Sequence, residues 1–99
     1  MAIKTKPFDP AKYFDTPEAQ ERLLDDALDS GDAGYVAHAL GTIARARGMS
    51  SIAEQTGLSR QALYAALSEN GNPTLDTVLK VARALQVKLQ ATSTAAAHA

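Results

Sequence analysis

The sequence contains no cysteine and no tryptophan, and its only two histidines, His38 and His98, lie far apart. The absence of thiolates excludes a disulfide framework and a thiolate zinc site, and two distant histidines do not form a metal site. No segment approaches the roughly 20 consecutive apolar residues of a membrane-spanning helix. Near the N-terminus, Pro7 and Asp9 fall where a secretory signal would need its apolar stretch. We therefore expect a cytoplasmic protein that binds no metal and no membrane.

The sequence also lacks any pattern that carries catalysis or holds a cofactor. Its serines, aspartates and His38 fall on separate predicted helices, without a nucleophile elbow. Gly31 and Gly34 bracket a turn but lack the glycine-rich pattern that binds phosphate. We expect no catalytic residue, no cofactor and no enzymatic activity.

Aromatic residues are few, three tyrosines and two phenylalanines, in a chain of 99 residues that is 45% hydrophobic. This length allows one domain, whose core must consist mostly of Ala, Leu, Val and Ile. Residues 1–34 carry four basic and eight acidic side chains, a net −4, whereas residues 35–99 carry six and three, a net +3. This uneven distribution favours two partners, a cationic protein and a phosphate backbone. Ordinary solvated helix surface is the simpler alternative.

Capping residues and apolar periodicity predict an all-α fold of five helices. Thr16, followed by Pro17, begins the first helix, and Gly31 ends it. Asp32 caps a second helix that runs to Arg47. The outer face of the first helix is acidic.

The third predicted helix is short. It is expected to begin at Ser50 or Ser51, where Ser51 and Glu54 would form a capping box. It ends at Gly57, which can adopt the left-handed conformation of a tight turn.

The fourth and fifth helices follow from similar signals. Ser59 caps the fourth, which runs from Arg60 to about Ser68, and Thr74 begins the fifth. The apolar positions of the fifth helix repeat at the helical period and are Leu75, Val78, Leu79, Ala82 and Leu85.

The C-terminal segment alternates apolar and polar residues and is expected to form a short strand. Val87, Leu89 and Ala91 share one face of it. An isolated strand leaves its backbone unpaired, so we expect it to pair with its symmetry mate in a homodimer. The alternative is that it folds back on its own domain. The expected organisation is an extension with an acidic helix over 1–31, a DNA-binding domain over 32–91 and a disordered tail over 92–99.

The residues 52–67 carry the clearest functional pattern, two short helices with a minimal connection. Ala53 is small enough to lie where the helices cross, and Gly57 lies at the turn. The inward positions are Ile52, Leu58, Leu63 and Ala66.

The outward positions of the fourth helix suit a DNA major groove. Arg60 can pair with guanine and Gln61 with adenine, and Tyr64 can pack on a sugar or a thymine methyl group. The alternative is a helical hairpin whose Arg60 and Gln61 are merely solvated. The expected DNA contacts are Ser50, Ser51, Ser59, Arg60, Gln61, Tyr64, Ser68, Asn70, Asn72 and Thr74.

The segment from Gly57 to Tyr64, together with Gly71 to Leu85, resembles the helix-turn-helix of the Cro and lambda-repressor superfamily. The first motif helix departs from the usual pattern, because Met49 to Ala53 is shortened and a phosphate-clamping glutamine is missing. Ser50, Ser51 and the helix-terminal amides would have to take that role.

A closer resemblance covers nearly the whole length. Pro7-Phe8-Asp9, Tyr13-Phe14 and the segment from Ala39 to Ser50 are similar to the addiction-module antidote proteins, a HigA-like antitoxin family. This resemblance implies a partner toxin of the RelE/ParE fold, usually small and basic, and autorepression of a shared operon on double-stranded DNA.

The charge distribution and the resemblance place the toxin-binding region in the N-terminal part of the chain. Its expected residues are Phe8, Tyr13, Phe14, Glu18, Glu21 and Asp25. Two alternatives stay open: a protein-interaction module in which the helix-turn-helix is only a scaffold, and a stand-alone phage-type repressor without a toxin.

Overall fold

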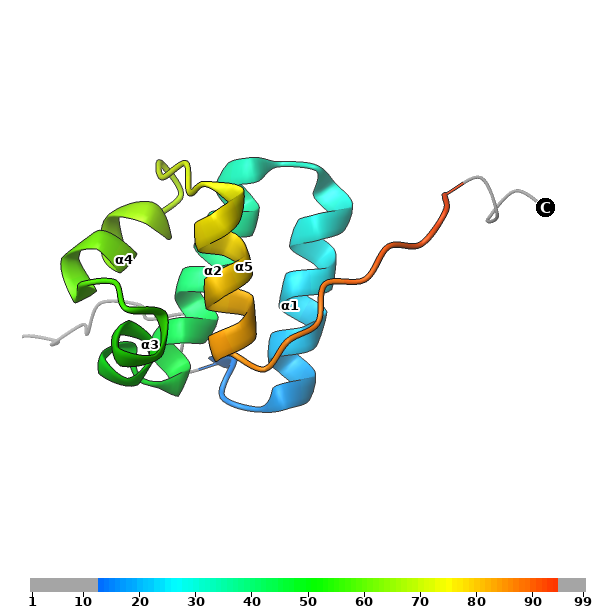
Figure 1. Cartoon of the computed structure of the whole chain (residues 1–99). Coiled ribbons are helices and arrows are strands. Elements are labelled where there is room, and N and C mark those ends of the chain that lie inside the picture. The colour runs from blue at the N-terminus through cyan, green and yellow to red at the C-terminus, as the bar shows by residue number, and fades with distance from the viewer. Residues whose placement is uncertain (1–12, 95–99) are drawn as a thin grey trace, which may run out of the picture.

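The computed structural model describes residues 13–94, so Phe8 and the end of the tail lie outside the described residues. Within this range the chain forms five helices: α1 (Pro17–Ser30), α2 (Ala33–Arg47), α3 (Met49–Thr56), α4 (Arg60–Ala66) and α5 (Leu75–Ala84). Figure 1 shows α1 on one side of the molecule, α3 and α4 on the other, and α2 and α5 between them. The prediction of an all-α, five-helix fold is confirmed for this part of the chain.

Side chains cap four of the five helices where the sequence predicts. The Thr16 hydroxyl accepts from the Ala19 amide at 3.2 Å, and the Asp32 carboxylate accepts from the Gly34 amide at 2.9 Å. Ser59 and Thr74 cap α4 and α5 in the same way. These caps depend only on neighbouring residues, because each satisfies an amide within the first turn of its own helix.

The start of α3 differs from the expectation. The helix begins at Met49, directly after Gly48, and no side chain caps it. Ser51 therefore forms no capping box; its hydroxyl instead accepts from the Gln55 side chain at 3.0 Å. The physical reason is packing, because the Met49 side chain is buried and Gly48, with a φ of 109°, turns the chain sharply enough to begin the helix there.

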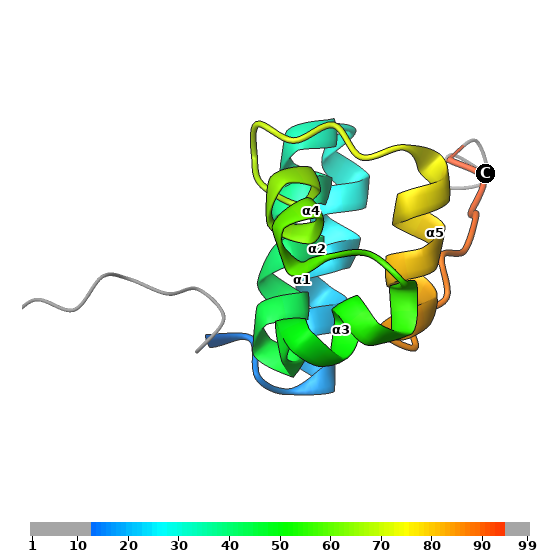
Figure 2. The same cartoon turned by 60° about the vertical axis from the view of Figure 1, so that its left-hand side comes forward.

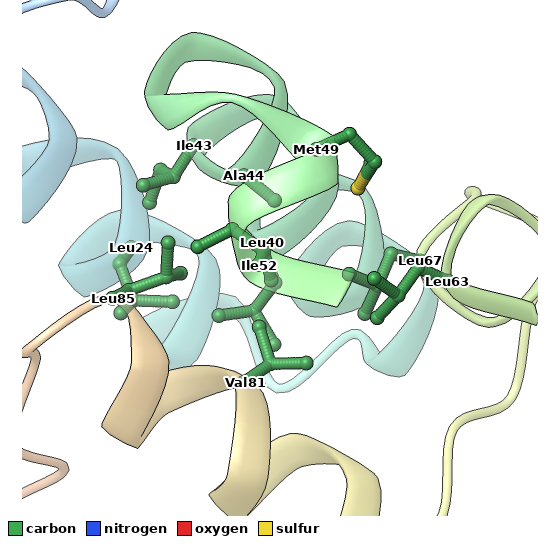
Figure 3. Close-up of a cluster of buried hydrophobic side chains, with 10 residues drawn as sticks. All are labelled: Leu24, Leu40, Ile43, Ala44, Met49, Ile52, Leu63, Leu67, Val81 and Leu85. Atoms are coloured by element: carbon green, nitrogen blue, oxygen red, sulfur yellow. The ribbon is translucent and has the colours of Figure 1, made fainter. Parts of the chain in front are cut away.

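The core gathers side chains from all five helices around α2 (Figure 3). Helix α2 packs against each of the other four. Leu40 and Ile43 of α2 are fully buried, as are Leu63 of α4 and Val81 of α5. Burying each such side chain contributes about 1.5–3 kcal/mol, so aliphatic residues supply the stability that the few aromatics do not.

A polar network joins α1 and the end of α5 to the last turn of α2. The Arg47 guanidinium donates to the Gln20 side-chain oxygen at 2.8 Å and to the Leu85 carbonyl at 2.9 Å. The Gln20 amide group donates to the Phe14 carbonyl at 2.8 Å. Gln20 is buried, and these bonds satisfy both ends of its side chain.

Helix α5 divides its apolar residues between two faces. Val81 and Leu85 are buried, whereas Leu75 is 71% exposed and Leu79 is 51% exposed. Leu75 and Leu79 lie one turn apart and roughly 120° and 160° around the helix from Val81. Ala82 belongs to the same stripe as Leu75 and Leu79 but is buried, so the stripe is covered only toward the end of the helix.

The C-terminal segment forms neither helix nor strand. Residues 87–91 run past the end of α5 and lie across a groove from α1, and residues 13–94 contain no strand with which they could pair (Figure 2). The Val87 amide donates to the Ala82 carbonyl at 2.9 Å, and Val87 and Leu89 pack against the core. The expected strand is therefore not present in the single chain.

We predict that Gly41→Ala destabilises the protein although alanine favours helices. A Cβ atom at Gly41 would overlap the Leu67 carbonyl oxygen and lie 3.2 Å from the Leu67 Cβ. Overpacking of this kind costs about 1–3 kcal/mol, more than the roughly 1 kcal/mol that replacing a helical glycine gains. Urea unfolding of both proteins measures the difference.

Gly57→Ala is the control for Gly41→Ala. Nothing surrounds a Cβ atom at Gly57, so only the left-handed φ of 75° opposes the change and no clash arises. A Gly41→Ala protein as stable as the wild type would show that α2 and Leu67 are not in close contact.

We predict that Gln86→Gly stabilises the protein. Gln86 has a φ of 58°, a left-handed conformation that glycine adopts freely and that residues with a side chain, apart from asparagine and aspartate, rarely adopt. Removing the side chain relieves a strain of about 1–2 kcal/mol, offset in part by the greater freedom of glycine in the unfolded chain. The expected net gain of about 0.5–1 kcal/mol can be measured by thermal unfolding; a loss of stability would contradict the assigned conformation.

Candidate functional site

Helices α3 and α4 meet at a tight connection. Gly57 ends α3 in the left-handed conformation, and Ser59 caps α4 two residues later. Ile52 and Leu63 are buried, and Leu58 packs against the same core. The residues that the sequence places inward thus hold the two helices against the rest of the molecule.

The outer face of α4 is polar and open to solvent. Ser59, Arg60 and Gln61 are exposed, and Tyr64 is 43% exposed. The Arg60 and Gln61 side chains form no hydrogen bond or ion pair with any of residues 13–94. The Ser59 hydroxyl accepts from the Ala62 amide at 3.0 Å, which leaves its own hydrogen available to a ligand.

The loop after α4 is held in a narrow turn. The Gly71 amide donates to the Ser68 carbonyl at 2.8 Å, and a Cβ atom at Gly71 would overlap the Ala66 carbonyl oxygen. Asn70 and Asn72 are exposed on either side of this glycine. Their backbone positions are therefore fixed by the turn.

The remaining expected DNA contacts differ in accessibility. Ser50 and Ser51 are exposed in the first turn of α3, and Thr74 is exposed at the start of α5. Ser68 is only half-exposed, and its hydroxyl donates to the Ala65 carbonyl at 3.1 Å. Thr74 also donates its hydroxyl hydrogen within the chain, to the Thr77 hydroxyl oxygen at 3.1 Å, so the hydroxyl hydrogens of Ser68 and Thr74 are already engaged.

A groove of about 600 Å³ lies between α1 and the C-terminal segment. The groove is lined from α1 by Glu18, Glu21, Arg22 and Asp25, and from the opposite side by Val87, Lys88 and Leu89, so three carboxylates and two cations lie there. Residues that the sequence assigned to two separate surfaces, one for a toxin and one for a dimer, therefore share one groove. Ala91, also assigned to the dimer surface, is exposed nearby in the chain.

The expected aromatic residues do not join this groove. Phe14 lines a different hollow, which Leu23, Asp29 and Tyr35 also line. Tyr13 is 67% exposed. Asp25 lines both hollows, so the two adjoin along α1, and Phe14 lies at the second one.

Sequence reasoning missed the hydrogen bond that joins α1 to α2 beside this hollow. The Tyr35 hydroxyl donates to the Asp26 carboxylate at 2.6 Å. This bond, which favours the protonated phenol, raises the pKa of Tyr35 above its ordinary value, with smaller contributions from desolvation and from the Asp26 charge. The bond joins residues nine positions apart across a turn, and no spacing rule in the sequence signals it.

The two candidate surfaces lie on different sides of the molecule. Figure 1 shows the outer side of α1 facing away from α4, with α2 and α5 between the two helices. The groove on α1 and the outer face of α4 therefore share no residue.

The described residues contain no group of three or more His, Cys, Asp or Glu side chains that could hold a metal ion. None of the helices in this part of the chain is long and apolar enough to cross a membrane.

Comparison with known proteins gives a family for the chain. A family model described as "probable addiction module antidote protein" matches residues 4–93. An uncharacterized protein of Haemophilus influenzae (strain ATCC 51907 / DSM 11121 / KW20 / Rd) is 43% identical over 90 residues, which cover 91% of this chain and 93% of that protein. No solved structure matches the chain. Since the family model covers nearly the whole chain, the protein belongs to the family of probable addiction module antidote proteins.

Proposed function

We propose that the protein is the antitoxin of a type II toxin-antitoxin module, which neutralises a small basic toxin of the RelE/ParE fold and represses its own operon. The observation that carries this proposal is the match of nearly the whole chain to an antidote family. The separation of an exposed polar helix, α4, from an acidic groove on α1 supports two partners rather than one. A stand-alone repressor has no use for the second surface.

DNA binding is assigned to α4, which would enter the major groove. The Arg60 guanidinium offers paired donors that match the two acceptors of guanine, and the Gln61 amide matches adenine. Because neither side chain is engaged within the described chain, neither has to break a bond before it contacts a base. The Ser59 hydroxyl would donate to a phosphate oxygen at the start of the same helix.

The first turn of α3 supplies a second phosphate contact. No side chain caps this helix, so the amides of its first turn lack a side-chain acceptor. Exposed amides at a helix start, with the positive end of the helix dipole, bind anions. Ser50 and Ser51 add hydroxyl groups there, which would compensate for the missing glutamine of the Cro and lambda-repressor pattern.

The acidic groove is assigned to the toxin. Its three carboxylates, from Glu18, Glu21 and Asp25, outnumber its two cations, Arg22 and Lys88, and would face a basic surface that otherwise contacts RNA. Leu28, 44% exposed at the same groove, offers an apolar contact beside the charges. The position of the groove away from α4 keeps these carboxylates from the DNA phosphates.

We predict that Arg60→Ala and Gln61→Ala each weaken binding to the DNA upstream of the gene by about 1–3 kcal/mol, the value of one base contact. Fluorescence anisotropy measures the affinity, and circular dichroism should show unchanged helicity. Arg22→Ala is the matched control, because Arg22 is exposed on α1 and its loss removes the same charge. If both α4 variants bind this DNA as the wild type does, α4 is not the reading helix.

We predict that Glu21→Lys weakens binding to the toxin encoded beside this gene at least about tenfold, mainly by slowing association, because it reverses a charge in the groove. Asp29→Lys is the matched control, since Asp29 is an exposed carboxylate of the same helix that does not line the groove. Biolayer interferometry at two salt concentrations measures both. Equal effects of the two substitutions would show that the groove is not the toxin-binding site. The assignment of DNA binding to α4 would be unaffected.

A further inference from the structure

A hollow of about 630 Å³ lies where α1 meets the start of α2, and we call it the Phe14 hollow. Its walls include the half-buried side chains of Phe14, Leu23 and Tyr35. The Tyr35 hydroxyl donates to the Asp26 carboxylate at 2.6 Å, which holds the Tyr35 ring beside α1. The hollow thus presents two aromatic rings and a leucine that residues 13–94 leave partly open to solvent.

Charged side chains surround these apolar walls. Three exposed carboxylates of α1, from Asp25, Asp26 and Asp29, line the hollow beside one cation, Arg22, among the described residues. The lining therefore carries a net charge of −2. An occupant that matches this surface presents apolar groups together with positive charge.

The part of the chain that precedes the described residues has this composition. Residues 1–12 contain three lysines and one aspartate, a net charge of +2, with Ile3 and Phe8 as large apolar side chains. Pro7 and Pro10 are three residues apart, and Lys12 follows them. Segments with prolines at this spacing favour the polyproline II conformation and bind grooves lined by aromatic side chains.

We propose that residues 1–12 occupy the Phe14 hollow of their own chain, with the prolines and Phe8 against its apolar walls and the lysines beside its carboxylates. The place where the segment joins the described part of the chain supports this occupant. Only Tyr13 separates Lys12 from Phe14, so the segment begins at the edge of the hollow.

The segment is also long enough to cover the hollow. In polyproline II conformation, residues 7–12 span about 19 Å, at about 3.1 Å per residue. The stretch of α1 from Arg22 to Asp29, which lines the hollow, is only about 10 Å long. The segment therefore reaches every carboxylate of the lining.

The covalent connection favours the chain's own segment over a separate partner. A ligand joined to its site by a short linker has an effective concentration on the order of millimolar. Contacts that are weak between separate molecules are therefore sufficient to fill the hollow from within the chain.

The Phe14 hollow adjoins the groove that we assign to the toxin. Arg22 and Asp25 line both. A docked segment borders the groove, so a partner that covers the whole outer side of α1 has to displace it. This consequence rests on the proposed function, whereas the docking of the segment does not.

Paramagnetic NMR of the full chain, without DNA or toxin, tests the proposal. The chain has no cysteine, so Thr5→Cys gives a single position for a nitroxide label. We expect the label to remove most of the amide signal intensity at Leu23 and Tyr35. The amides of α4, on the other side of the molecule, should keep theirs (Figure 1).

Charge reversal separates docking from mere proximity along the chain. Lys4→Glu combined with Lys6→Glu should restore the lost signals, and Asp29→Lys should do the same from the side of the hollow. All three substitutions together should bring back the loss, because the charges are again complementary. Glu54→Lys is the matched control, since Glu54 is an exposed carboxylate of α3 that does not line the hollow, and it should change nothing. Circular dichroism should show equal helicity for all these proteins.

Three results would overturn the proposal. One is a signal loss that is equal with and without the charge reversals, because the short distance along the chain would then explain it. Another is a loss at Leu23 and Tyr35 of isotope-labelled chains without nitroxide when they are mixed with nitroxide-labelled chains, which would make a second copy the occupant. The third is full signal intensity around the hollow in the free chain, which would leave the hollow to a separate partner. Because these measurements use neither DNA nor toxin, their failure leaves the proposed function standing.

Discussion

The small size of the residues along α2 lets the other helices approach it closely. Ala37, Ala39, Gly41 and Ala44 are all buried, and they alternate with Leu40 and Ile43. With so little side chain on α2, the backbone of Leu67 comes into contact with Gly41 itself. A tightly packed interior leaves no room for an added methyl group. The neighbouring helices therefore cannot shift independently of one another.

The orientation of α4 depends on this packing. Leu63 and Leu67, which are fully or nearly fully buried, hold the inner side of α4 against α2 and the core. Ser59, Arg60 and Gln61 consequently point to solvent, whichever ligand they bind. The candidate DNA surface is therefore a direct result of how α4 sits on α2.

The features that the sequence predicts correctly are those that neighbouring residues decide. The caps at Thr16, Asp32, Ser59 and Thr74 satisfy amides within one turn, and the helical period separates the inner from the outer side of α4. The predicted start of α3, at Ser50 or Ser51, was wrong because burial of Met49 outweighs the capping preference of Ser51. The groove was not predictable, because it exists only where the C-terminal segment folds beside α1. The burial of Gln20 was not predictable either, because a polar side chain in an acidic helix is expected to be exposed.

The hydrogen bonds of Arg47 make α1 part of the structural framework as well as a candidate binding surface. They join residues 27 and 38 positions apart, and Leu24 of α1 lies in the core that α4 also completes. A ligand that binds only the folded chain shifts the folding equilibrium toward the native state. Binding at α1 therefore raises the fraction of chains in which α4 is correctly placed, and by thermodynamic reciprocity binding at α4 does the same for α1. Even without a change of shape, a ligand bound at one of these candidate sites would stabilise the folded form of the other.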